Sequence, residues 1–228
     1  MLTDVLITNN DARLGGGIFN YFGTADLTNV TFQKNFAAKG GGAMDGFSLT
    51  TMTNVTFSNN SASNSGGGFN SANSISTLTN VTFSGNAAIE GGAIYYAAND
   101  PTKSMTLKNT IIANSVEGGD CYIPEESDND ITSAGFNLIS DNTCDDIFNH
   151  PSDWNEVDPL LGPLAANGGY AWSHVPQAGS PVIDKGQCLA HVSTDLRGIP
   201  RPQGPACDIG AVERKVLEDT VYLPMIVR

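Results

Sequence analysis

Positive charge is scarce in this sequence, because 11 Lys and Arg residues stand against 24 Asp and Glu residues, a formal net charge of −13. The imbalance is uneven. Residues 1–115 hold five basic and six acidic residues, whereas residues 116–228 hold six basic and eighteen acidic ones. Binding to nucleic acid or to anionic lipid requires a basic surface. The charge pattern therefore argues against both as partners.

Long hydrophobic runs are absent as well. No window approaches the roughly 18 uninterrupted apolar residues that a membrane-spanning helix requires. The opening residues Met1–Asp4 do not show the basic and then apolar pattern of a signal peptide. We therefore expect a chain that does not span a membrane and that carries no export signal of its own.

Cysteine is rare and confined to the second half of the chain. No CxxC pair occurs, and zinc sites usually combine closer cysteine pairs with histidine. Two disulfides are the better interpretation, and they predict an oxidising compartment. The four cysteines are Cys121, Cys144, Cys188 and Cys207.

A short unit recurs through the first half. Each copy holds an LTNVTF-like core, and successive copies begin 25, 25, 26 and 29 residues apart. The first four copies are each followed by a glycine cluster. A fixed period in this range indicates a solenoid. The five copies are Leu2–Asn10, Leu27–Asn35, Met52–Asn60, Leu78–Asn86 and Leu107–Ser115.

The period inside the unit selects the type of solenoid. In VTF, apolar side chains alternate with threonine, which is typical of strands, and no helical stripe runs through the repeats. Copies that run in the same direction stack as parallel strands about 4.8 Å apart. The sequence therefore predicts an all-β parallel β-helix of about 25 residues per coil. Because Leu2 would begin in mid-coil, we expect it to stack on upstream β-helix residues.

Each recurring position has a predicted structural task. Valine and phenylalanine form inward columns, and the asparagine after them bonds the next coil where the strand turns. Glycine supplies positive φ and room at a corner. The predicted ladder consists of Val30, Val55, Val81, Phe32, Phe57, Phe83, Asn35, Asn60 and Asn86.

The NVT triplets also spell N-glycosylation acceptors at Asn29, Asn54 and Asn80. Our interpretation is that these asparagines form a second ladder at the strand entry, because every other recurring position has a structural task. Glycosylation is the alternative, and it matters only if the protein is exported through a glycosylating pathway.

The strings FQKN, FSNN and FSGN, each preceding a GGA or GGG cluster, resemble the repeats of polymorphic outer membrane proteins and of related bacterial secreted β-helix proteins. The resemblance covers roughly Leu2–Ser115. It implies a right-handed parallel β-helix that is exported and displayed at a surface.

Beyond Ser115 the regular period lapses, but three apolar segments remain: GFNLIS at Gly135–Ser140, SPVIDKG at Ser180–Gly186 and CDIGAVE at Cys207–Glu213. We expect them to be further coils separated by longer loops, with Ile112, Leu138, Ile183 and Ile209 pointing inward. The predicted domains are thus regular repeats over 1–115, an irregular β-helix continuation over 116–213 and a tail strand over 214–228.

Asp158–Glu213 holds DPLLGPLAANGG, SPVIDKG, TDLRGIPRPQG and CDIGAVE in succession. This combination resembles the C-terminal region of bacterial proteins with a choice-of-anchor Q domain, and it implies a β-helix attached to or released from a cell surface. In that setting, locality favours the pairs Cys121–Cys144 and Cys188–Cys207, although the sequence alone allows three pairings. The closing VYLPMIV is expected to be one more strand, and no sorting motif follows it.

Catalysis is the competing hypothesis, because parallel β-helices commonly carry polysaccharide lyases and glycoside hydrolases. Hydrolysis needs two carboxyl groups that face one sugar, and the acids of the regular coils do not recur at a stacked position. His150, His174 and His191 stand alone in the sequence, without a nucleophile motif beside them. We therefore predict a protein that is not an enzyme, with a carbohydrate-active enzyme as the alternative.

No cofactor is predicted, but calcium has weak candidates in the acidic segments Pro124–Asp130 and Ser140–Asp146. Their spacing does not match an EF-hand, and a solvated acidic loop is the simpler interpretation. The candidate ligands are Asp128, Asp130, Asp145 and Asp146.

The outward positions of the repeats predict a binding face. Thr31, Thr56 and Thr82 would form a column, with a second column at Thr28, Thr53 and Thr79, and the aromatics Phe47, Phe69, Tyr95 and Tyr96 lie nearby. A glycan or another cell-surface ligand fits such a face, and ice is a remote alternative. The sequence therefore predicts an extracellular or bacterial cell-surface module for adhesion, recognition or structural display.

Overall fold

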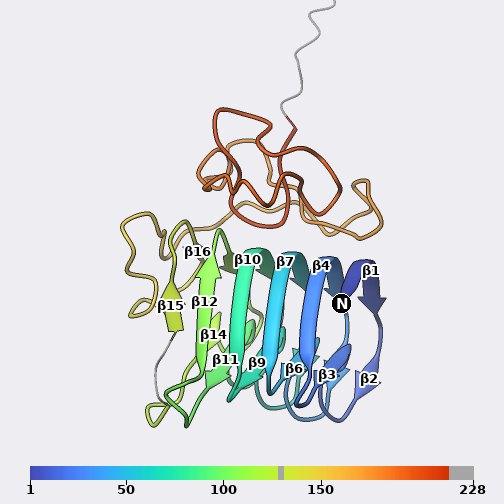
Figure 1. Cartoon of the computed structure of the whole chain (residues 1–228), viewed down its shortest axis with the longest axis vertical. Coiled ribbons are helices and arrows are strands. Elements are labelled where there is room, and N and C mark those ends of the chain that lie inside the picture. Colours follow the sequence, from blue (N-terminus) through green and yellow to red (C-terminus); the bar gives the residue numbers. More distant parts are fainter. Residues whose placement is uncertain (128–130, 216–228) are drawn as a thin grey trace, which may run out of the picture.

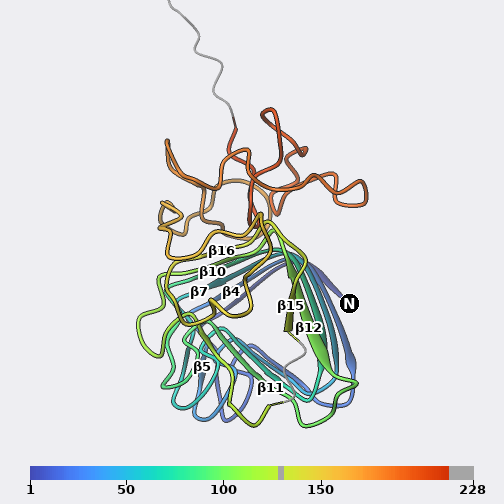
Figure 2. The ribbon, with the colours of Figure 1, turned by 90° about the vertical axis from the view of Figure 1, so that its left-hand side faces the viewer.

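The computed structural model describes residues 1–127 and 131–215, and these residues form sixteen β-strands and no helix. The strands wind into a parallel β-solenoid of about five turns with about 26 residues per turn. Figure 1 shows the coils side by side, and Figure 2 looks along their common axis. The predicted all-β parallel β-helix is confirmed. None of the described residues forms a helix long and apolar enough to cross a membrane.

Three parallel sheets form the walls. The strands of the first sheet are β1 (Leu2–Thr8), β4 (Thr24–Gln33), β7 (Leu49–Ser58), β10 (Ile75–Ser84), β12 (Ser104–Lys108), β13 (Ile111–Ala113), β15 (Ile131–Ser133) and β16 (Leu138–Ile139). The second sheet holds β3 (Ile18–Asn20), β6 (Met44–Gly46), β9 (Phe69–Ala72), β11 (Ile94–Ala97) and β14 (Cys121–Tyr122). The third holds β2 (Asp11–Ala12), β5 (Phe36–Ala37) and β8 (Ser61–Ala62).

The core consists of like residues stacked from coil to coil. The register pairs Val30 with Val55 and Val55 with Val81, and all three are fully buried. The rings of Phe32, Phe57 and Phe83 stack nearly parallel, with centroids 4.8 and 4.6 Å apart. Offset stacking adds to the apolar area that these rings bury. The predicted inward columns are confirmed.

Two ladders of asparagine side chains supply the hydrogen bonds that the backbone needs where the strands turn or bend. At the corner after the first sheet, Asn35 Nδ2 donates to Asn60 Oδ1 at 3.0 Å, and Asn60 Nδ2 donates to Asn86 Oδ1 at the same distance. Each of these Oδ1 atoms also accepts a backbone N–H from the neighbouring coil. Because Asn60 and Asn86 are buried, these bonds replace lost water contacts. The predicted corner ladder is confirmed.

The NVT asparagines form the second ladder, at a bend in the middle of the long strands. Asn29, Asn54 and Asn80 adopt φ of +55°, +53° and +53°, a left-handed conformation that asparagine tolerates better than most residues. Asn54 Nδ2 donates to Asn29 Oδ1 at 3.2 Å, and Asn80 Nδ2 donates to Asn54 Oδ1 at 3.4 Å. Their structural role is confirmed.

Adjacent glycines before the second sheet have different tasks. Gly41 and Gly66 have φ of +68° and +62°, so they supply the left-handed turn. The following residue, Gly42, lies against the next coil, where a Cβ atom would stand 2.2 Å from the carbonyl oxygen of Gly67. Recurrence of the GG pair therefore reflects two separate steric requirements.

The second half departs from the prediction. GFNLIS contributes a coil through β16, although Ile112 pairs with Ile139 rather than with Leu138. SPVIDKG and CDIGAVE form no strand, so the expectation that they continue the solenoid is wrong. Residues 158–215, here called the cover segment, instead lie outside the solenoid over one end of the long strands (Figures 1 and 2).

Val182 and Ile209 explain this placement of the cover segment. Both are buried in an apolar cluster with Ile111, Ala113 and Leu138 on the outer surface of the first sheet. The cover segment thus buries its apolar side chains against the outside of the solenoid, without forming a strand. The predicted limits of the three domains stay a prediction, and the predicted VYLPMIV strand lies outside the described residues.

Candidate functional site

The cover segment hides the threonine column that the sequence predicted as a binding face. Thr31, Thr56 and Thr82 point outward but are 0, 0 and 3% exposed. Thr31 Oγ1 donates to the carbonyl oxygen of Trp172 at 2.6 Å, and the backbone N–H of Ala211 donates to Thr82 Oγ1 at 3.0 Å. That prediction is therefore wrong for these three residues, because the protein's own chain occupies the face.

Side-chain amides of the second ladder, which holds Asn29, Asn54 and Asn80, also bind the cover segment. Asn54 Nδ2 donates to the carbonyl oxygen of Thr194 at 2.9 Å. Asn109, which continues the ladder from Asn80, bonds both the N–H and the carbonyl of Gln187, at 2.9 and 2.8 Å. An amide side chain here pairs with a backbone as a neighbouring strand would. The ladder thus binds the coils to one another and to the cover segment.

Two of the predicted aromatic binding residues lie in the core. The second residue after each GG pair points inward. Phe69 and Ile94 both hold this position, and they are paired in the register of β9 and β11. Tyr96, two residues after Ile94, is also buried. The prediction is wrong for Phe69 and Tyr96, because alternation along β9 and β11 places them on the inner face. Tyr95 points outward, is partly exposed and stacks on Tyr122 with ring centroids 5.8 Å apart.

An exposed aromatic cluster, which the sequence analysis missed apart from Phe47, lies at the corner between the second and first sheets. Phe19, Tyr21 and Phe22 are 45, 59 and 78% exposed. Phe19 stacks on Tyr21 at 5.7 Å, and Phe47 makes edge contacts with both. The signal was present in IFNYFG, because alternation from the inward Ile18 makes Phe19 and Tyr21 outward.

Three members of the cluster, Tyr21, Phe22 and Phe47, line a groove of about 530 Å³. Leu49 and Ile75, which are stacked outward residues at the starts of β7 and β10, also line it. Ser48, Asn73 and Lys103 supply the polar groups. Lys103 lies 3.8 Å from Asp100, so its charge is partly balanced.

Phe22 is also conformationally unusual. Its φ is +57°, which costs roughly 1–2 kcal/mol for a residue with a side chain, and the following residue is Gly23. Because Phe22 is largely exposed, burial does not offset this cost. Backbone strain of this kind concentrates at functional sites. We therefore take the groove beside Phe22 as the candidate binding site.

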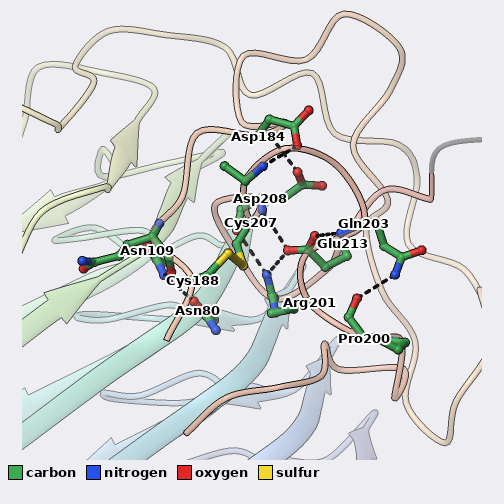
Figure 3. The surroundings of a disulfide bond; sticks show 12 residues. Asn80, Asn109, Asp184, Cys188, Pro200, Arg201, Gln203, Cys207, Asp208 and Glu213 are labelled. Carbon is green, nitrogen blue, oxygen red and sulfur yellow. Dashed lines mark hydrogen bonds and ion pairs between the residues drawn. A yellow bond between two sulfur atoms is a disulfide. The ribbon is translucent and has the colours of Figure 1, made fainter. Parts of the chain in front are cut away.

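The four cysteines form the predicted bonds, Cys121–Cys144 and Cys188–Cys207. Figure 3 shows the second disulfide beside Asn80 and Asn109, with Arg201 directed at Glu213. The Arg201–Glu213 ion pair measures 2.5 Å, and both side chains are almost fully buried. Arg197 pairs with Asp195 at 2.8 Å in the same segment. Because these ions bond each other and the backbone, they hold the cover segment together.

Two buried titratable groups lie outside the groove. Burial raises the pKa of Asp45 to about 6, against the opposing effect of a hydrogen bond from Asn70 Nδ2 at 2.7 Å. Within the described residues, Asp45 Oδ2 accepts no hydrogen bond. Burial lowers the pKa of His174, whose Nε2 lies 3.0 Å from Ser58 Oγ and whose Nδ1 lies 2.7 Å from the carbonyl oxygen of Gly162. His150 and His191 are exposed.

The other candidates do not come together. Asp26, Asp45 and Asp11 lie on the first, second and third sheets respectively. Among the proposed calcium ligands, Asp145 and Asp146 are exposed, while Asp128 and Asp130 lie outside the described residues. Over residues 1–127 and 131–215, no group of three His, Cys, Asp or Glu side chains is placed to hold a metal ion.

Comparison with known proteins gives a match for part of one repeat. Residues 80–97, which run from the bend at Asn80 to the end of β11, match the model of the Chlamydia polymorphic membrane protein (Chlamydia_PMP) repeat. No curated protein and no solved structure matches the chain significantly. The chain is thus a parallel β-solenoid in which residues 80–97 are similar to a repeat of this family. The resemblance of residues 158–213 to choice-of-anchor Q domains stays a prediction.

Proposed function

We propose that the protein is a non-catalytic recognition module of an extracellular or bacterial cell surface, and that it binds a glycan in the groove beside Phe19, Tyr21, Phe22 and Phe47. The observation that carries the proposal is the solvent-exposed aromatic cluster beside the groove, in which Phe22 has a φ of +57°. The turns that carry Tyr21, Phe22 and Phe47 join paired strands of the solenoid, which limits the ordering cost on binding.

The setting agrees with this role. The two disulfides suit an oxidising, extracytoplasmic environment. The repeat match over residues 80–97 is to a family described as polymorphic membrane proteins, which supports display at a cell surface. The apolar C–H face of a sugar ring packs on an aromatic face, while Ser48 and Asn73 offer hydrogen bonds to hydroxyl groups.

A glycan array tests the proposal, with the bound sugars also examined for cleavage products in the presence and absence of calcium. Phe22→Ala removes an exposed ring, so we expect at least about a tenfold loss of affinity. Phe36→Ala is the matched control, because Phe36 is 37% exposed on the third sheet, away from the groove. Equal binding by the two variants would contradict the site, and product formation would favour the enzyme instead.

A further inference from the structure

The groove continues into a flat outer face that the cover segment leaves open. In the first halves of the long strands, the register aligns Leu49 with Ile75, Thr51 with Thr77, and Thr53 with Thr79. All six are exposed or partly exposed, unlike the buried Thr56 and Thr82 farther along the same strands. The threonine columns extend to neighbouring coils at Thr3, Thr28, Thr106 and Thr132.

The geometry of this face is regular in two directions. Equivalent residues on successive coils stand about 4.8 Å apart, and neighbouring columns stand about 6.6 Å apart along the strand. Each threonine offers a methyl group and a hydroxyl that both donates and accepts. Strand propensity favours threonine, but it does not by itself produce a column. The outward column of the second sheet shows this, because it mixes Phe19, Tyr95 and Tyr122 with the buried Asp45 and Asn70.

The face carries no charge at its centre. The six outward positions of β7 and β10 named above hold only threonine, leucine and isoleucine. Asp26 and Lys108 lie in the same columns but on the coils at either side. Exposed strand positions usually include charged residues, and the whole chain has a net charge of −13. An uncharged ligand is therefore favoured over an anionic one.

Leu49 and Ile75 belong both to this face and to the groove, so the aromatic cluster forms its margin. We propose that the groove and the threonine columns bind a neutral, repeating polysaccharide as an ordered, insoluble array. Sugar rings stack on Tyr21, Phe22 and Phe47, and hydroxyl groups of the polymer bond the threonines of successive coils. This inference rests on the proposed function and names the class of glycan.

Co-sedimentation with microcrystalline cellulose and with chitin tests the inference. Thr77→Lys places a charge at the centre of the face, and Ser63→Lys places the same charge at an exposed corner before the second sheet. We expect the wild type and Ser63→Lys to sediment alike with at least one of the two polymers, and Thr77→Lys to bind at least about tenfold more weakly. Circular dichroism of both variants confirms that they fold.

The outcomes separate the two proposals. Phe22-dependent binding of soluble sugars, without sedimentation on either polymer, would overturn the inference and leave the groove intact. Sedimentation that Thr77→Lys does not reduce, or a preference for anionic polygalacturonate, would also overturn it. Suppression of ice recrystallisation that Thr77→Lys abolishes, without polymer binding, would reassign the face to ice. If the wild type bound neither a soluble sugar on the array nor an insoluble polymer, the proposed function itself would be refuted.

Discussion

The regular coils and the cover segment reach stable folds in different ways. In the coils, each apolar residue packs on its own counterpart one turn away, as Phe57 does between Phe32 and Phe83. In the cover segment no strand forms, and buried ion pairs, a disulfide and bonds to the asparagine ladder hold the chain. In the repeats, each strand pairs its backbone N–H and C=O groups with the next coil. In an irregular segment, each backbone group needs a specific hydrogen-bond partner of its own.

This difference predicts different consequences of damage. Loss of a stacked ring removes contacts with both neighbouring coils, so the solenoid should weaken as a unit. Loss of one ion in the cover segment leaves the other buried without a partner. That damage should be local, because the strands of the coils keep their own hydrogen bonds.

The largest expected effect is that of Phe57→Ala. Removal of a fully buried ring between two stacked rings should lower the free energy of unfolding by about 3–5 kcal/mol. Chemical denaturation followed by circular dichroism measures it. Phe36→Ala removes a ring that is 37% exposed, so it should cost about half as much or less. Similar losses in the two variants would show that ring stacking does not stabilise the coils.

Glu213→Gln should act on the cover segment alone. It leaves the buried Arg201 without its ion partner, a change worth about 3 kcal/mol. Limited proteolysis should then cut within residues 158–215 while the strand signal in circular dichroism persists. Glu156→Gln alters an exposed glutamate and should leave the proteolysis pattern unchanged. If the strand signal in circular dichroism were lost together with the resistance of residues 158–215 to proteolysis, the two regions would unfold as one.

The coils were predictable because their physics is periodic. Recurrence of valine and phenylalanine in VTF identifies the inward columns, and recurrence of asparagine identifies positions where a turn needs a side-chain amide. Even the inward position of Phe69 could have been predicted locally, because counting residues from the GG pair aligns Phe69 with Ile94. Such information lies within one turn of the chain.

The covered face was not predictable in the same way. Thr53 and Thr56 are both threonines that point outward from the same strand, yet Thr56 is buried and Thr53 is partly exposed. The difference arises from contacts such as that of Thr31 with Trp172, 141 residues apart in the sequence. No periodicity connects such partners. Apolar alternation in SPVIDKG predicted another coil, whereas Val182 packs on the outer surface.

Asp45→Asn should stabilise the coils at high pH. The folded pKa of about 6 exceeds the ordinary value of 3.8, so folding is favoured by protonated Asp45, and this contribution is lost as pH rises through 6. Asparagine retains an acceptor for Asn70 without a charge. The gain should therefore approach 2–3 kcal/mol at pH 8 and vanish near pH 4. Thermal unfolding of both proteins across this range measures it.

A difference between wild type and Asp45→Asn that does not vary with pH would contradict a buried, protonatable carboxyl. The matched control is Asp26→Asn on the exposed outer face of β4. Solvation of that carboxylate leaves little to gain, so the change in stability should stay within about 0.5 kcal/mol.

The smallest effect concerns the ladder that joins the two regions. Asn54→Gln places a longer side chain at φ of +53° and removes the bond to Thr194, so stability should fall by about 1–2 kcal/mol.

Asn54 and Asn80 are buried, and a sugar on either would displace the cover segment. After secretion through a glycosylating pathway, mass spectrometry should therefore find both asparagines unmodified. A sugar on Asn54 would mean that the cover segment docks late or not at all, whereas modification confined to the partly exposed Asn29 is compatible with the fold.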